Sequence, residues 1–351
     1  MPSSALPTST TENTVSFSET LRSFLDRLPV RTRAIVEARF GISGSQPKTL
    51  EEIGQTYGIT RERVRQIIGS ALGYVAGEHV HPLIVRITAL VQSTLREKSG
   101  IMDTEEFLRK LTQEDRKERG ALLVFIECLS IVRFEKMTVE HEEIYMLRDF
   151  DLAAWKKVKD AARDLLERTE EPLTDKSFYD RFKTKSPDIS EKMFFDFLAV
   201  AKDVKQNVFD KWGLTSSSDI SPRGTREKAH LILKAVGKPL HFREIATLID
   251  KNGLQGKKEK SHPQTVHNEL IKDNRFVLVG RGIYALSEWG YKKGTVKEVV
   301  AEILRLSGKP LSQEEILTEV MKSRQVKKST VIINLNTFFT RVGKNAYTVK
   351  K

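Results

Sequence analysis

The sequence feature that most limits the possible folds is a repeat that recurs after residue 80. Each copy carries two apolar residues five positions apart: Met102 with Phe107, Leu173 with Phe178, Leu240 with Ile245, and Leu311 with Ile316. The first members of successive pairs are separated by 71, 67 and 71 residues. This period is longer than that of the usual solenoid repeats, so it predicts a series of small and similar domains.

The copies share a predicted order of secondary structure. A helical stretch precedes each pair, over residues 82–98, 152–168, 225–236 and 295–306. A short helix, another helix and a hairpin follow, and Gly-containing turns make the hairpin clear at 275–286 and 338–349. Three helices and a hairpin describe a winged helix-turn-helix. The sequence leaves open whether the first two copies have complete wings.

These patterns predict a mainly α protein: an N-terminal helix-turn-helix followed by tandem winged helix-turn-helix units with small β-hairpin wings. The Ser/Thr-rich start is expected to be a disordered tail, and a Ser/Asp/Pro/Gly stretch is expected to be a linker. The predicted divisions are the tail (1–18), the helix-turn-helix (19–80), two degenerate winged units (81–150 and 151–215), the linker (216–224) and two further winged units (225–291 and 295–351).

Residues 19–80 carry several consistent helix signals. An apolar stripe predicts a first helix, and Gly41 ends a second one. Thr49-Leu50-Glu51-Glu52 has the pattern of a capping box that opens a third helix. Gly58 supplies a tight turn before a fourth helix that starts at Thr60. Two helices joined by a short Gly-containing turn predict a helix-turn-helix, whose second helix enters the major groove of DNA.

The segment from Thr60 to Ile67 opens this second helix. Its apolar stripe is expected to seat the helix on its own domain and consists of Val64, Ile67, Ile68 and Ala71. The side chains that then point outward together are Arg61, Glu62, Arg65 and Gln66. Arg can pair with guanine, Gln with adenine, and Glu can accept a hydrogen bond from cytosine. The outward face therefore predicts sequence-specific DNA reading.

The N-terminal unit resembles region 4 of the sigma-70 family of bacterial sigma factors. The resemblance rests on residues 28–33, 39–41, 49–54 and 60–67. In that family the domain reads the promoter −35 element and docks on the flap of the RNA polymerase beta subunit. The resemblance implies that Arg61, Glu62, Arg65 and Gln66 read bases, and that Thr49, Thr60 and Arg63 contact phosphates.

The chain also departs from that family. A complete sigma factor needs a preceding domain that melts the −10 element, and only eighteen residues precede the unit in this sequence. We therefore expect a sigma-like reader that is not a complete sigma factor. Its expected partners are double-stranded DNA and, through the resemblance, the beta flap of core RNA polymerase.

Charge is divided unevenly along the chain. Residues 1–80 hold nine Lys and Arg against eight Asp and Glu, and residues 81–215 hold 24 against 26. Residues 216–351 hold 26 against 13, so they carry all the excess positive charge. A basic segment of this kind favours a polyanion, most often nucleic acid, although a solubilising Lys-rich surface is the alternative.

Residues 225–291 resemble the HARE-HTH domain, a winged helix found in the bacterial RNA polymerase delta subunit, in restriction-associated proteins and in chromatin factors. The matching segments are 229–233, 237–241, 244–245, 262–266, 275–276 and 282–286. Residues 295–351 look like a shorter relative. Recognition helices are expected at 263–272 and 330–338.

A second basic surface is predicted on these two units, with cations before each recognition helix and on each wing. In the first unit it comprises Lys257, Lys258, Lys260, Gln264, His267, Asn268 and Arg281, and in the second it comprises Lys327, Lys328 and Lys344. Winged helices also serve as protein-docking modules, so contact with a protein is the alternative.

The sequence offers no sign of catalysis. It has no phosphate-binding Gly-rich loop, no nucleophile elbow and no metal motif, and its one cysteine, Cys128, lies in an apolar run. We expect no cofactor, no metal, no enzymatic activity and no membrane segment.

The sequence as a whole favours a DNA-binding protein of bacterial transcription, located in the cytoplasm with the nucleoid. One alternative is a delta-like accessory protein of RNA polymerase that reads no specific sequence. Another is a DNA-binding module of a restriction or defence system. Target genes, the sign of regulation and the oligomeric state are not readable from the sequence.

Overall fold

The computed structural model describes residues 15–256, 260–291, 293–324, 326–343 and 345–350. The described residues form sixteen α-helices and eleven short strands, in agreement with the predicted fold class. The chain divides into two compact units, one of residues 1–165 with 179–204 and the other of 166–178 with 205–351. Within the described residues no helix is long and apolar enough to cross a membrane.

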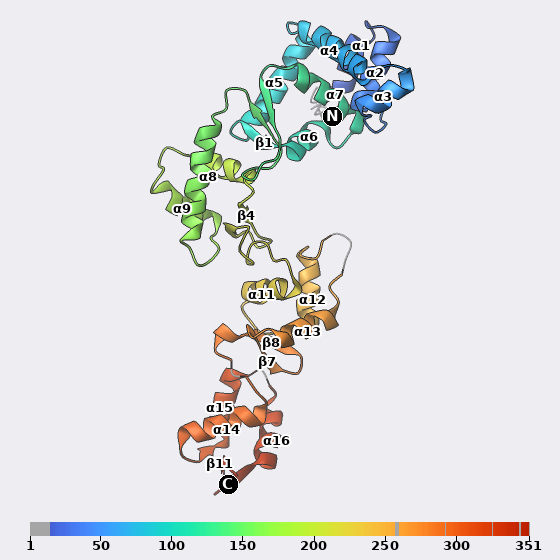
Figure 1. The fold of residues 1–351 in the computed structure, drawn as a ribbon. Coiled ribbons are helices and arrows are strands. Elements are labelled where there is room, and N and C mark those ends of the chain that lie inside the picture. Colours follow the sequence, from blue (N-terminus) through green and yellow to red (C-terminus); the bar gives the residue numbers. More distant parts are fainter. Residues whose placement is uncertain (1–14, 257–259, 292, 325, 344, 351) are drawn as a thin grey trace, which may run out of the picture. The chain divides into compact units, whose positions relative to one another are not determined.

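Four helices make up the predicted N-terminal reader (Figure 1): α1 (Phe17–Leu25), α2 (Val30–Phe40), α3 (Leu50–Tyr57) and α4 (Arg61–Gly77). The Ser16 side chain caps α1 by accepting a hydrogen bond from the Glu19 amide. Gly41 ends α2 with a φ of +69°, a left-handed conformation that glycine adopts at little cost. The predicted capping box opens α3, where Thr49 and Glu52 bond each other's backbone amides.

The next segment has the element order of a winged helix. It contains α5 (Pro82–Arg96), β1 (Ile101–Asp103), α6 (Thr104–Thr112), α7 (Arg116–Cys128), β2 (Val132–Glu135) and β3 (Ile144–Leu147). The three strands form an antiparallel sheet in the order β1-β3-β2. This unit therefore has a complete wing, which the sequence left open.

One apolar core joins this winged unit to the N-terminal reader. A continuous cluster of buried residues runs from Phe17 in α1 to Leu147 in β3. Helix α7 supplies much of the junction, because it packs against α1, α2 and α4 (Figure 1). The core thus continues across the predicted division between residues 80 and 81.

The following segment contains α8 (Leu152–Glu167), α9 (Asp175–Lys183), α10 (Glu191–Ala199), β4 (Val204–Gln206) and β5 (Trp212–Leu214). Strands β4 and β5 form a two-stranded sheet, and Leu173 pairs with Trp212 in an isolated bridge. Its element order repeats that of a winged helix in a reduced form. Its residues divide between the two compact units.

Two more winged units follow within the second compact unit. The first contains α11 (Thr225–Val236), β6 (Leu240–His241), α12 (Phe242–Lys251), α13 (Pro263–Lys272), β7 (Phe276–Gly280), β8 (Ile283–Leu286) and a 3₁₀ turn, η1 (Ser287–Trp289). The last contains α14 (Val296–Ser307), β9 (Leu311–Ser312), α15 (Gln313–Ser323), α16 (Lys328–Phe338), β10 (Phe339–Val342) and β11 (Ala346–Val349). Each unit has its own apolar core.

The repeated apolar pair has a clear structural role. In three units its first member lies in the short strand before the second helix, and that strand pairs with the last strand of the hairpin, as in β6-β8-β7. The second member lies one turn into the following helix and is buried, as Phe107 and Ile245 show. The pair ties the second helix to the wing sheet, which explains why it recurs once per domain.

Candidate nucleic-acid interface

The turn between α3 and α4 sets the geometry of the predicted reading helix. Gly58 adopts a φ of +64°, and a Cβ on Gly54 would lie only 2.7 Å from the carbonyl oxygen of Ile59. The two glycines therefore let the chain reverse closely between the helices. The Thr60 hydroxyl then accepts a hydrogen bond from the Arg63 amide at 3.2 Å and starts α4 at Arg61.

The apolar side of α4 has the predicted stripe. Val64, Ile68 and Ala71 are buried, and Ile67 is half-buried. This packing leaves the opposite side of the first two turns in solvent. All four predicted base readers, Arg61, Glu62, Arg65 and Gln66, are exposed there.

Three of these side chains are bonded to one another. Glu62 accepts two hydrogen bonds from Arg65, at 2.8 Å from Nε and 2.6 Å from a terminal nitrogen. Gln66 Nε2 donates to the same carboxylate at 3.4 Å, and Arg63 donates to Gln66 Oε1 at 3.2 Å. The bond from Arg65 lowers the pKa of Glu62, and the same bond raises the pKa of Arg65. Glu62 therefore stays ionised and orients the guanidinium before DNA arrives.

The predicted phosphate contacts lie at the two helix starts. Thr49, Thr60 and Arg63 are all exposed. The Thr49 hydroxyl donates to Glu52 Oε2 at 2.8 Å and accepts from the Glu52 amide, so its local role is the capping box. Helix N-termini attract phosphate through their free amides, and both threonines sit at such positions.

Helix α7 supports this reader in a way that the motifs did not reveal. The Glu118 carboxylate accepts hydrogen bonds from the Phe17 amide at 2.7 Å and from the hydroxyls of Ser16 and Ser18 at 2.9 and 2.5 Å. A Cβ on Gly120 would lie 2.3 Å from the carbonyl oxygen of Phe40. The backbone of α7 thus touches the end of α2. The glycine inside an apolar helical run was the only signal in the sequence.

The second predicted surface is assembled in part on α13. Gln264 and Asn268 are exposed and bonded to each other at 3.3 Å, and Lys260 and Arg281 are exposed beside the helix start and on the wing turn. Lys257 and Lys258 lie outside the described residues.

His267 has a different environment from the other members of that surface. Its ring stacks on Phe242 at 4.5 Å between centroids, and its Nδ1 lies 3.0 Å from the Tyr284 hydroxyl. It is half-buried and connects α13 to β8. In the free protein His267 therefore holds the recognition helix against the wing sheet.

In the last unit, Lys327 and Lys328 are exposed at the start of α16, and Lys344 lies outside the described residues. The outward side of α16 is less polar than that of α4. Ile333 is 63% exposed, and the Asn334 amide donates to the Thr330 carbonyl of its own helix. This helix therefore offers phosphate contacts more readily than base contacts.

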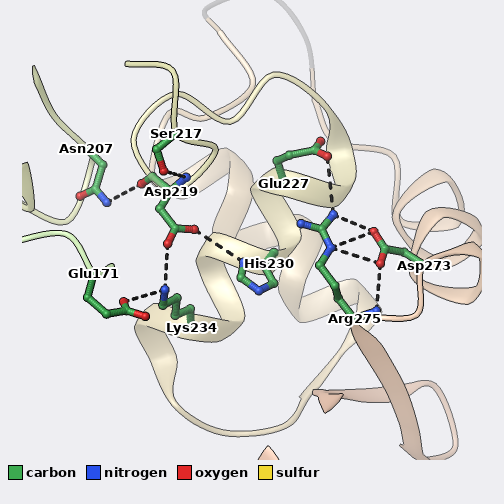
Figure 2. A network of polar contacts seen from close by, with 9 residues as sticks. All are labelled: Glu171, Asn207, Ser217, Asp219, Glu227, His230, Lys234, Asp273 and Arg275. Atoms are coloured by element: carbon green, nitrogen blue, oxygen red, sulfur yellow. Dashed lines mark hydrogen bonds and ion pairs between the residues drawn. The ribbon is translucent and has the colours of Figure 1, made fainter. Parts of the chain in front are cut away.

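Many charges of the basic segment are neutralised internally. Figure 2 shows Asp219 pointing toward both His230 and Lys234, with its Oδ2 2.8 Å from the Lys234 ammonium. Hydrogen bonding from His230, followed by that from Lys234, lowers the pKa of Asp219 to about 2. The Asn207 side chain also donates to the Asp219 carbonyl, so the predicted linker is held against α11.

A second group in Figure 2 pairs Arg275 with Asp273 at 2.6 Å, with Glu227 at 3.6 Å from the same guanidinium. Arg226 pairs in a similar way with Glu269. By contrast, Lys260 and Arg281 form no ion pair with any residue that the structure describes. The cations available to a polyanion are thus those around α13 and its wing.

The comparisons with known proteins agree with this geometry. Residues 24–74 match the family described as Sigma-70, region 4. Residues 224–289 match the HARE-HTH family, whose description names an HTH domain of ASXL and restriction endonuclease proteins. The chain therefore contains a sigma-70 region 4 segment, which is a DNA-binding helix-turn-helix, and a HARE-HTH domain.

Among curated relatives, the chain is similar to the RNA polymerase sigma factor SigA of Microcystis aeruginosa, with 48% identity over 54 residues. It is also similar to the SigA of a Nostoc species at 48% and of a Bacillus species at 44%, over the same length. The similarity covers 15% of this chain and 13 to 14% of these sigma factors.

Proposed function

We propose that this protein is a sequence-specific DNA-binding protein of bacterial transcription that reads a −35-like element with α4. The observation that carries the proposal is the exposed group of Arg61, Glu62, Arg65 and Gln66 at the start of a capped and well-seated helix. Arg, Gln and Glu are side chains that can distinguish base pairs in the major groove. The similarity of this segment to SigA supports the same reading.

The basic winged helices are proposed to hold the DNA without reading it closely. The region around the reader is almost neutral, and electrostatic attraction to phosphates supplies much of the affinity of DNA-binding proteins. Lys260, Arg281, Lys327 and Lys328 are exposed on the winged units. Because both contacts are on one chain, binding by one raises the effective concentration of the other.

Selection of bound sequences from random DNA by the full chain tests the reading role. We expect enrichment of a motif similar to a −35 element, and an unenriched pool would refute specific readout. Arg65→Ala should weaken binding to the preferred sequence by about 1 to 3 kcal/mol and relax selection at one base pair. Arg22→Ala, at an exposed arginine of α1, is the matched control and should leave selection unchanged.

Lys260→Ala tests the holding role. We expect it to weaken binding to all sequences to a similar extent and to reduce the salt dependence of binding by about one unit of slope. A loss restricted to the preferred sequence would instead assign Lys260 to base reading. Titrations at several salt concentrations, with preferred and unrelated DNA, separate these outcomes.

We also propose contact with core RNA polymerase, because the similar proteins are RNA polymerase sigma factors. A pull-down with core polymerase in the presence of nuclease tests this directly. Retention of polymerase supports the contact, and its loss upon nuclease treatment shows that DNA alone joined the two. Polymerase retention without any selected DNA motif would favour the delta-like accessory role.

The proposed function involves binding without catalysis, at the nucleoid of a bacterial cell. Burial raises the pKa of the Cys128 thiol to about 12, so the thiol stays protonated at neutral pH. Its Sγ donates a weak hydrogen bond to the Leu72 carbonyl at 3.4 Å. These contacts favour a packing role for the single cysteine.

A further inference from the structure

The wing of the first winged unit has a free edge. Strand β2 lies at the border of the sheet β1-β3-β2, and no described strand pairs with its outer side. The Arg148 amide donates to the Ile131 carbonyl, which makes this pair a hydrogen-bonded one in the antiparallel ladder. Hydrogen-bonded and non-bonded pairs alternate, so Arg133 and Glu135 bond β3. The backbone groups of Val132 and Phe134 therefore point outward.

The side chains at this edge are unusual for a wing that would hold DNA. Phe134 is 43% exposed, and Met137, just past the strand, is 57% exposed. The two charges of the strand, Arg133 and Glu135, are opposite in sign and cancel. Free sheet edges that carry apolar side chains tend to pair with another strand.

The order of the residues in β2 indicates which strand that is. We propose that β2 pairs with β2 of a second copy of this chain, in antiparallel register about a two-fold axis at Phe134. In this register the two Phe134 residues exchange their outward N–H and C=O groups. Arg133 of each copy then lies opposite Glu135 of the other, so the strand is complementary to itself, as a two-fold interface requires.

The charges on this edge are suited to such an exchange. The side chains of Arg133 and Glu135 are 38% and 41% exposed, and their closest approach is 3.7 Å within one strand. That separation is too long for a hydrogen bond, and the Arg133 Nε has no hydrogen-bond partner among the described residues. Across the two-fold axis the pair occupies a non-hydrogen-bonded position, where opposing side chains come closest.

The result is a continuous antiparallel sheet, β1-β3-β2 joined to β2-β3-β1 of the second copy. A ladder of four residues per chain is a small interface compared with the roughly 1,200 to 2,000 Å² of stable complexes. We therefore expect a dimer with micromolar affinity. Such a dimer would carry two copies of α4, although the pairing itself does not depend on the proposed DNA reading.

Analytical ultracentrifugation of the full chain without DNA tests this proposal. Between about 1 and 200 µM, the weight-average mass should rise from 40.0 kDa toward twice that value. Arg133→Glu places two like-charged pairs across the axis, and so does Glu135→Arg. Each single variant should weaken association by about tenfold or more.

Two further samples identify the interface. The double variant R133E/E135R restores opposite charges across the axis and should associate like the original chain. An equimolar mixture of the two single variants should also associate, because each chain then complements the other. Far-UV circular dichroism and thermal unfolding verify that all variants fold equally well.

A chain that stays at 40.0 kDa across the range would overturn the proposal. Single variants that associate as tightly as the original chain would also overturn it, because association would then use another face. Failure of the mixture to associate would exclude the register about Phe134.

Discussion

Gly120 offers the sharpest test of how the reader is held in the first compact unit. A Cβ at this position would lie 2.3 Å from the carbonyl oxygen of Phe40, whereas carbon and oxygen atoms approach to about 3.3 Å at closest. Gly120→Ala must therefore separate α7 and α2 by about 1 Å. The same movement strains the bonds from Glu118 to Ser16, Phe17 and Ser18, two residues away.

The expected cost follows from these contacts. Overpacking of a core costs about 1 to 3 kcal/mol, and weakening hydrogen bonds to a charged group adds about 1.5 kcal/mol. Replacing glycine by alanine inside a helix returns up to about 1 kcal/mol. We expect a net loss of about 2 to 3 kcal/mol in the free energy of unfolding. For a unit of this size that corresponds to a fall in Tm of about 4 to 10 °C.

Differential scanning calorimetry of the full chain measures this change. Gly73→Ala is the matched control, since Gly73 lies in α4 and a Cβ there meets nothing within 4 Å. The control should raise the Tm slightly, because only the helix propensity changes. A Gly120→Ala variant that is as stable as the original chain would refute the close contact of α7 with α2.

Two further predictions concern the boundaries of the units. A fragment that ends at residue 80 loses α7 and exposes part of the continuous core, so it should show a broad, low thermal transition, whereas a fragment that ends at residue 150 should unfold cooperatively; equal cooperativity of the two would contradict a shared core. The second concerns Asp219, whose pKa falls from 3.8 to about 2 upon folding. A lowered pKa stabilises the fold above the unfolded value, so about 2 kcal/mol should be lost as the pH falls from about 4 to 2. Asp219→Asn should remove this pH dependence in acid titrations followed by circular dichroism, and an unchanged acid transition would show that the carboxylate contributes nothing.

Local patterns were sufficient for much of the fold. The predicted helices at 225–236 and 263–272 coincide with α11 and α13 as observed. The capping box at Thr49 and the turn at Gly58 also occur as predicted. Caps, turns and helical periodicity depend on residues within about one turn of each other, so they can be recognised in the sequence.

Contacts between distant segments were beyond the reach of these patterns. His267 has the spacing of a reading residue on α13, yet its ring packs on Phe242 and Tyr284, which come from other elements. Asp219 lies in a stretch with the composition of a linker, yet His230 and Lys234 bind it. Composition and spacing do not show which partner a polar side chain meets.

The sequence by itself determined the classes of the two recognisable domains and the outward face of the reading helix. Both follow from residues close in the chain, where spacing alone decides which side of a helix a residue occupies. Only the tertiary structure decided that α7 completes the core of the reader, and that β2 leaves a free edge with Arg133 and Glu135 on either side of Phe134. Packing between segments about 100 residues apart, such as α1 and α7, depends on shape and close approach in three dimensions, which no local pattern records.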